Sequence, residues 1–120
     1  MKNLKNLFSV LFLVTGFLCF SQNDKKEIQT QVSKMVSDWN THEFKNMDSY
    51  MAEDVEWVNI VGMHWKGRNE VKAAHQGNFS AFFKGVPFTQ KNLQIRFITK
   101  DVAVAILVSS VGEFFPPGMA

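Results

Sequence analysis

Two polar side chains on otherwise apolar segments, His75 and Asn59, are the residues of this chain that could take part in chemistry. An imidazole can donate or accept a proton near neutral pH, and burial shifts its pKa. An asparagine amide can bind a carbonyl or hydroxyl group of a ligand. Each residue could equally be a polar group of the core, with His75 bonded to a backbone carbonyl or to Asn59. The sequence alone leaves both roles open.

Aromatic residues are expected to surround these two side chains. Trp57 shares one strand face with Asn59, because side chains two residues apart on a strand point the same way. Aromatic side chains dominate small cores, so packing is their first expected role, and some of them can also wall a pocket. With His75 as the catalytic acid or base, we predict these ligand-binding residues: Asn59, Trp57, Trp39, Tyr50 and Phe79.

Several other kinds of site do not fit the spacing of the residues. The three histidines, His42, His64 and His75, are not spaced as metal ligands on one helix face. We therefore predict no metal. The glycines form no dinucleotide fingerprint, and we also predict no cofactor. His64 is expected to face solvent. Asp54 and Arg68 could form an ion pair, but both flank the ends of predicted elements, where capping and strand entry explain them.

Helices are predicted at the start of the segment that carries these residues. From Asn23 to Asn40, apolar residues recur at three- and four-residue steps, which is the pattern of an amphipathic helix. Asn23 or Asp24 is its expected N-cap. Polar side chains, Asp38 among them, fill the rest of this helix. A second, short helix is predicted from Phe44 to Asp54.

Strands are predicted for most of the remaining chain, since β-branched and aromatic residues fill it between glycine and proline breaks. The elements after the second helix are a strand at Val55–Val61, its partner at Met63–Lys66, a helix at Asn69–Lys84 and two longer strands at Phe88–Thr99 and Val102–Glu113. This order predicts an α+β fold in which three N-terminal helices pack on a curved, mostly antiparallel sheet. An apolar concavity between the layers would hold a ligand.

The N-terminal segment has the features of a cleavable signal peptide. Lys2 and Lys5 precede an uncharged, largely apolar stretch from Leu7 to Phe20. That stretch is shorter than the roughly 20 apolar residues that span a membrane. Small side chains at Cys19 and Ser21 suit cleavage directly after Ser21. An uncleaved or lipidated anchor is the alternative.

Removal of this signal peptide, residues 1–21, would leave one neutral domain, residues 22–120. The excess of Lys+Arg (13) over Asp+Glu (11) equals the two lysines of the signal peptide, so no basic surface for nucleic acid remains. The only cysteine, Cys19, would also leave, and with it any disulfide or thiol nucleophile. We predict a periplasmic or secreted domain with no permanent membrane span and no nucleic-acid partner.

Several short motifs occur in one order: Trp39-Asn40, the run Asp54–Gly62, Gly67-Arg68, Val71 and His75. Together with the order of elements, they resemble the nuclear-transport-factor-2-like superfamily, and within it the SnoaL-like domains and the SgcJ/EcaC branch. The resemblance covers residues 22–120 and implies a cone-shaped fold whose cavity is lined by Trp57, Asn59 and His75. Such cones serve as isomerases, cyclases, dehydratases, binding modules and assembly domains.

The steroid isomerases of this superfamily allow a residue-by-residue comparison. The position of their general-base aspartate falls on Asn59, whose amide cannot take a proton from carbon near neutral pH. The position of their oxyanion-hole tyrosine falls on Met35, which can donate no hydrogen bond. The position of their second pocket tyrosine falls on His75. Steroid-isomerase chemistry by that mechanism is therefore not expected.

The resemblance also implies further strands after Glu113 that would close the sheet. Their absence from this sequence favours a fragment over a shortened domain that covers an open edge by association. Two functions follow as hypotheses. The first is an exported domain that binds a small, largely apolar molecule, with isomerase-, cyclase- or dehydratase-like chemistry if it is catalytic. The second is a non-catalytic binding or dimerisation module. A homodimer is expected.

Overall fold

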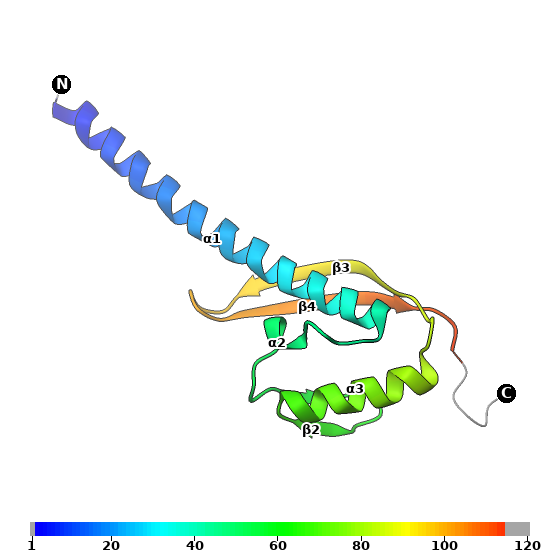
Figure 1. The fold of residues 1–120 in the computed structure, drawn as a ribbon. Helices are drawn as coiled ribbons and strands as arrows, with labels where there is room; N and C mark the ends of the chain where they lie inside the picture. Colours follow the sequence, from blue (N-terminus) through cyan, green and yellow to red (C-terminus); the bar gives the residue numbers. More distant parts are fainter. Residues whose placement is uncertain (1, 115–120) are drawn as a thin grey trace. The chain divides into compact units, whose positions relative to one another are not determined.

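A computed structural model describes the backbone of residues 2–114 and the side chains of residues 22–77 and 81–114 (Figure 1). Contacts divide the chain into two compact units, residues 1–30 and residues 31–120. The first unit is the N-terminal part of helix α1 (Lys2–Thr41). The second unit holds the end of that helix and all other elements, and therefore contains the candidate site.

Helix α1 begins well before the predicted N-cap. The helix is continuous from Lys2 to Thr41, a range that contains no proline. The prediction that a helix starts at Asn23 is therefore wrong for the whole chain. The side chains of the predicted signal peptide lie outside the described residues. In the described part of the chain, no helix has the length and hydrophobicity needed to cross a membrane.

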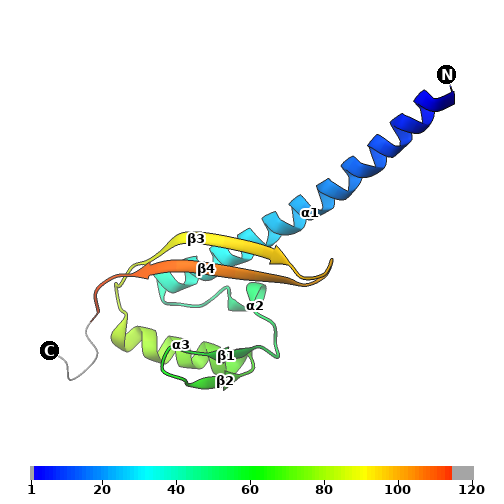
Figure 2. The ribbon, with the colours of Figure 1, turned by 180° about the vertical axis from the view of Figure 1, so that it is seen from behind.

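The second unit contains two antiparallel hairpins that are separated in sequence by a helix (Figures 1 and 2). Its elements after α1 are α2 (Met47–Tyr50), β1 (Glu56–Val58), β2 (His64–Lys66), α3 (Arg68–Phe82), β3 (Phe88–Phe97) and β4 (Ala103–Val111). This confirms the predicted order of elements. The predicted bounds of α3 and of the two strands of the second hairpin lie within two residues of the observed ones, and the start of β3 at Phe88 is identical.

The two hairpins are separate sheets of two strands each in the described part of the chain. Trp57 of β1 lies opposite Trp65 of β2, and Leu93 of β3 lies opposite Leu107 of β4. Antiparallel pairing was therefore predicted correctly. A single curved sheet was not, because the described strands of one hairpin do not pair with those of the other.

A tight turn shortens the first hairpin relative to the prediction. The side-chain oxygen of Asn59 accepts hydrogen bonds from the backbone N–H groups of Val61 (3.1 Å) and Met63 (2.8 Å). Gly62 completes the turn with a φ of 82°, in the left-handed region that glycine adopts readily. Strand β1 consequently ends at Val58 instead of Val61.

The fully buried apolar core is small. Among the described residues, Phe44, Met47 and Val71 are its fully buried apolar side chains. Half-buried side chains pack around them: Trp39, Tyr50, Met51, Val55, Trp57, Trp65 and Phe83. Two polar side chains are also buried, Asp38 and His75, with 2% and 4% of their surface exposed. The core thus joins the end of α1, α2, the first hairpin and α3, and it includes two polar groups.

Candidate functional site

The His75 imidazole lies at the centre of a group of aromatic rings. The distances from its ring centre to the neighbouring ring centres are 5.0 Å to Trp57, 5.3 Å to Phe44, 5.7 Å to Trp39 and 5.8 Å to Trp65. All four contacts are edge-to-face, an arrangement that aromatic rings favour. We call these five residues the His75 cluster.

Each member of the His75 cluster comes from a different segment, and the local backbone conformation directs its side chain toward the core. His75 lies one helical turn after the buried Val71 on α3, so both point from the same face of the helix. Trp57 and Trp65 are direct partners across the hairpin and share its inner face. Phe44 lies in the loop between α1 and α2, where it has a left-handed φ of 47°.

The hydrogen bond of the imidazole defines which nitrogen carries a proton. His75 Nδ1 lies 2.8 Å from the carbonyl oxygen of Val71. A carbonyl oxygen can only accept, so Nδ1 must donate, and in the neutral ring Nε2 then has the lone pair. Nε2 is therefore the acceptor nitrogen of the neutral ring.

Burial lowers the pKa of His75 below its ordinary value of 6.5, and the hydrogen bond to Val71 opposes this in part. The charged form loses hydration among the aromatic rings, so the neutral form is favoured. At neutral pH the ring is a base whose Nε2 is unprotonated. The sequence predicted that burial would shift the pKa of His75, and the structure gives the direction of that shift as downward.

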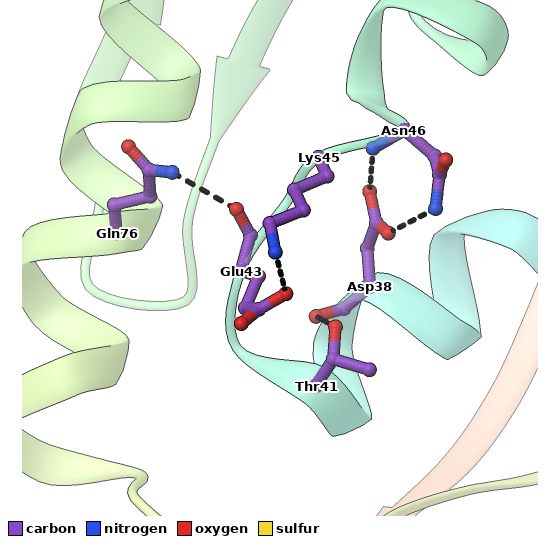
Figure 3. Close-up of polar contacts among 6 residues, drawn as sticks. All are labelled: Asp38, Thr41, Glu43, Lys45, Asn46 and Gln76. Atoms are coloured by element: carbon purple, nitrogen blue, oxygen red, sulfur yellow. Dashed lines mark hydrogen bonds and ion pairs between the residues drawn. The ribbon is translucent and has the colours of Figure 1, made fainter.

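Asp38 is buried in the structure, although the sequence pattern places it on the polar side of the first helix. Its carboxylate accepts hydrogen bonds from the backbone N–H of Asn46 (3.0 Å), the side-chain amide of Asn46 (2.9 Å) and the hydroxyl of Tyr50 (3.1 Å). Figure 3 shows the two Asn46 bonds, with Thr41 bound to the backbone carbonyl of Asp38. Asp38 therefore fixes the loop after α1 to that helix.

This loop has a strained backbone that needs such support. His42 and Phe44 both have positive φ values, 59° and 47°, which non-glycine residues seldom adopt. The side-chain amide of Gln76, on α3, donates to the carbonyl of Glu43 at 2.9 Å (Figure 3). The loop is thus held from both α1 and α3, and this places the Phe44 ring against His75.

Tyr50 is predicted as a ligand-binding residue, and the structure places its hydroxyl on Asp38. Its ring packs against the buried core of Phe44, Met47 and Val71. Burial, the negative charge of Asp38 and the hydrogen bond to it together raise the pKa of Tyr50 well above the ordinary value of 10.0. The Tyr50 hydroxyl therefore keeps its proton and donates a hydrogen bond to the buried carboxylate of Asp38.

The other predicted ligand-binding residues are placed differently. Trp39 and Trp57 both contact the His75 ring, so three predicted site residues are brought together. Asn59 lies in the turn after β1, where its side-chain oxygen binds two backbone N–H groups. The side chain of Phe79 lies outside the described residues. A ligand role for Asn59 stays a prediction, since its observed bonds are those of a turn residue.

Two polar contacts near the first hairpin join side chains of neighbouring elements. Arg68 at the start of α3 pairs with Asp48 of α2, with 3.3 Å between Nε and Oδ1, and not with Asp54. His64 is exposed, as predicted, and its Nε2 lies 3.0 Å from Glu56 Oε2 on the same face of the hairpin. Within the described residues, no group of three or more acidic, histidine or cysteine side chains could hold a metal ion.

Comparison with solved structures identifies the fold. An uncharacterized protein with a cystatin-like fold from Caulobacter vibrioides is 27% identical, with a TM-score of 0.73 over 78% of this chain and 66% of that one. A domain of unknown function with a cystatin-like fold from Nostoc punctiforme is 25% identical, with a TM-score of 0.67 over 81% and 58%. The chain thus spans two thirds or less of each neighbour.

The cystatin-like fold is the same fold class as the nuclear-transport-factor-2-like and SnoaL-like domains. The predicted fold class is therefore confirmed at this level, and the SgcJ/EcaC branch stays a prediction. No family model matches the sequence, and no curated protein has a significantly similar sequence.

The single tyrosine of the chain makes the Asp38 contact measurable. We expect the tyrosinate absorbance of the native protein to appear only well above pH 10, because burial and Asp38 disfavour ionised Tyr50. Stability should fall above about pH 10, where the unfolded tyrosine loses its proton first. In Asp38→Asn the midpoint of the tyrosine titration should move back toward about 10. In Asn46→Ala, which keeps the carboxylate of Asp38, this midpoint should stay raised. Equal midpoints in the two variants would show that Asp38 does not raise the pKa of Tyr50.

The lowered pKa of His75 predicts a loss of stability in mild acid. As pH falls through about 6.5, the unfolded histidine binds a proton before the buried one does, so the free energy of unfolding decreases. Urea titrations at about pH 7.5 and pH 5.5 should show a smaller decrease for His75→Phe, whose ring keeps the shape but cannot titrate. Equal decreases in the two proteins would show that His75 is not the titrating group.

Proposed function

We propose that residues 22–120 form an exported domain of the cystatin-like fold that binds a small, largely apolar molecule beside His75. One observation carries the proposal: a buried imidazole lies within a group of aromatic rings, three of which belong to half-buried tryptophans. Ligand sites of this kind combine an apolar wall with a few polar groups that orient the ligand. The fold of the two structural neighbours is compatible with such a site.

The polar part of the proposed site is the Nε2 atom of His75. Because Nδ1 donates to Val71, Nε2 can accept a hydrogen bond from a ligand hydroxyl group. If the domain is catalytic, the same atom would take a proton from one ligand position and return it to another, which is the net change of an isomerisation. The low pKa keeps Nε2 unprotonated and ready for that step at neutral pH.

A non-catalytic dimerisation module is the second candidate function, and one observation favours it. Strand β4 carries a row of exposed apolar side chains, Val104, Ile106 and Val108, with 45%, 55% and 51% of their surface exposed. Rows of this kind on soluble proteins commonly mark contact surfaces. In this role the His75 cluster would be part of the core, and a homodimer would be the functional form.

Export is proposed from the N-terminal sequence. Lys2 and Lys5 before the apolar stretch Leu7–Phe20, with small residues near Ser21, support cleavage after Ser21 and a periplasmic or secreted location.

Ligand binding can be tested with two fluorescent probes that differ by one hydroxyl group, naphthol and naphthalene. Naphthol should bind wild-type protein more tightly, because its hydroxyl can donate to His75 Nε2. In His75→Phe that preference should fall about 3- to 10-fold, the value of one hydrogen bond. Trp57→Ala should weaken both probes, since it removes an aromatic wall.

The matched control for this test is His64→Phe, because His64 is exposed and outside the cluster. It should leave the binding of both probes unchanged. An unaltered preference for naphthol in His75→Phe would contradict a ligand role for Nε2. The lack of saturable binding of either probe to the wild-type domain would contradict the ligand site and leave the dimerisation module as the proposed function.

Export can be tested by expressing the whole chain in a bacterium that has a periplasm. We expect protein in the periplasmic fraction whose mass begins at Gln22, because cleavage follows Ser21. Leu13→Asp places a charge in the apolar stretch and should leave the uncleaved chain inside the cell. Full-length wild-type protein in the cytoplasm, or a lipid on Cys19, would contradict the proposal.

A further inference from the structure

The His75 ring is almost fully enclosed by its neighbours. It has 4% of its surface exposed, and Phe44, which packs against it, is fully buried. A molecule larger than water can therefore reach the ring only if a neighbouring side chain moves. The four aromatic residues that surround the imidazole differ in how firmly their backbones are held. This difference indicates which of them can move.

Three of these four rings belong to regular secondary structure. Trp57 and Trp65 lie opposite each other on the paired strands β1 and β2. Trp39 lies on α1, and its ring packs against that of Phe88 on β3, with 4.7 Å between the ring centres. The side chain of Asn40 binds both the backbone N–H and the carbonyl of Phe88 at 2.9 Å, so this end of α1 is fastened to β3. A backbone shift at any of the three tryptophans would break hydrogen bonds of a helix or strand.

Phe44, the fourth ring, comes instead from a surface loop. The residues on either side of it, Glu43 and Lys45, have 54% and 74% of their side chains exposed, and their charged groups pair at 2.6 Å (Figure 3). Phe44 between them is fully buried. The loop therefore lies between solvent and the His75 ring, and the Phe44 side chain is the part of the loop that closes the His75 cluster.

The backbone of this loop is strained and is held in place by side chains. His42 and Phe44 both have left-handed φ values, 59° and 47°, a conformation that is unfavourable for residues other than glycine. The bonds of the Asp38 and Gln76 side chains to backbone groups of the loop oppose that strain. Gln76 is exposed, so its bond to the loop competes with water. Loss of that bond would let the loop relax without a change in any helix or strand.

We propose that residues 42–46, which we call the Phe44 loop, act as a gate that opens by withdrawing the Phe44 ring from His75. The gate is closed in this structure, and the bond from Gln76 to the loop must break before it opens. In the open form the His75 ring would be accessible to the ligand of the proposed function, and the purpose of the gate rests on that function. The opening itself is a property of the chain alone, so it is measured without a ligand.

The test measures how fast diethyl pyrocarbonate, a reagent for unprotonated histidine nitrogens, modifies each histidine of the whole chain at neutral pH. Mass spectrometry of peptides gives the separate rates. The exposed His64 should react quickly and His75 slowly. In Gln76→Ala the rate at His75 should rise about 3- to 10-fold, the value of one hydrogen bond, while the rate at His64 stays the same. Gln94→Ala, which removes an exposed glutamine of β3, is the matched control and should change neither rate.

Urea distinguishes opening of the gate from unfolding of the whole domain. Below the unfolding transition, the rate at His75 should hardly depend on urea in wild type and in Gln76→Ala, because local opening exposes little surface. A rate that rises steeply with urea would overturn the gate, and so would equal rates at His75 in the two proteins.

Naphthol separates the gate from the ligand site. Saturating naphthol should protect His75 from modification, which would support both. A gate that opens as expected, with no protection by naphthol, would support the gate and contradict the ligand site. Protection by naphthol without an effect of Gln76→Ala on the ligand-free rate would overturn the gate and leave the ligand site standing.

Discussion

The burial of one imidazole is the constraint on which the centre of this fold depends. His75 is 4% exposed, and rings from α1, the following loop and both strands of the first hairpin lie against it. A charged ring would lose its hydration there, so the neutral form is favoured. The bond to Val71 leaves Nε2 as the basic nitrogen. One side chain thus fills the core and carries the chemistry of the proposed site.

The loop that brings Phe44 to this ring depends on Asp38. Left-handed backbone at His42 and Phe44 costs about 1–3 kcal/mol per residue, and burial of a carboxylate costs several more. Hydrogen bonds to a charged group contribute about 1.5–3 kcal/mol each, and Asp38 accepts three from Asn46 and Tyr50. These terms are similar in size. The network therefore defines the loop conformation more than it adds net stability.

Most elements and part of the site could be predicted from sequence, because periodicity reports which face is buried. It placed His75 on the inner face of α3 and Trp57 on the inner face of the hairpin. Asn59 was expected to continue the first strand, with its side chain on the same face as Trp57. In the structure its side chain accepts hydrogen bonds from the backbone of Val61 and Met63, and the strand ends before it. Asp38 and Phe44 were missed as neighbours of the site, because a buried carboxylate and a left-handed phenylalanine depend on contacts with residues distant in sequence.

Nitrogen-15 NMR of the histidine side chains, with and without naphthol, tests most directly whether His75 presents a basic Nε2 to a ligand. We predict that His75 at neutral pH carries its proton on Nδ1 and that naphthol shifts its Nε2 resonance in the direction of an accepted hydrogen bond. A proton on Nε2, or an Nε2 resonance that saturating naphthol leaves unchanged, would contradict it.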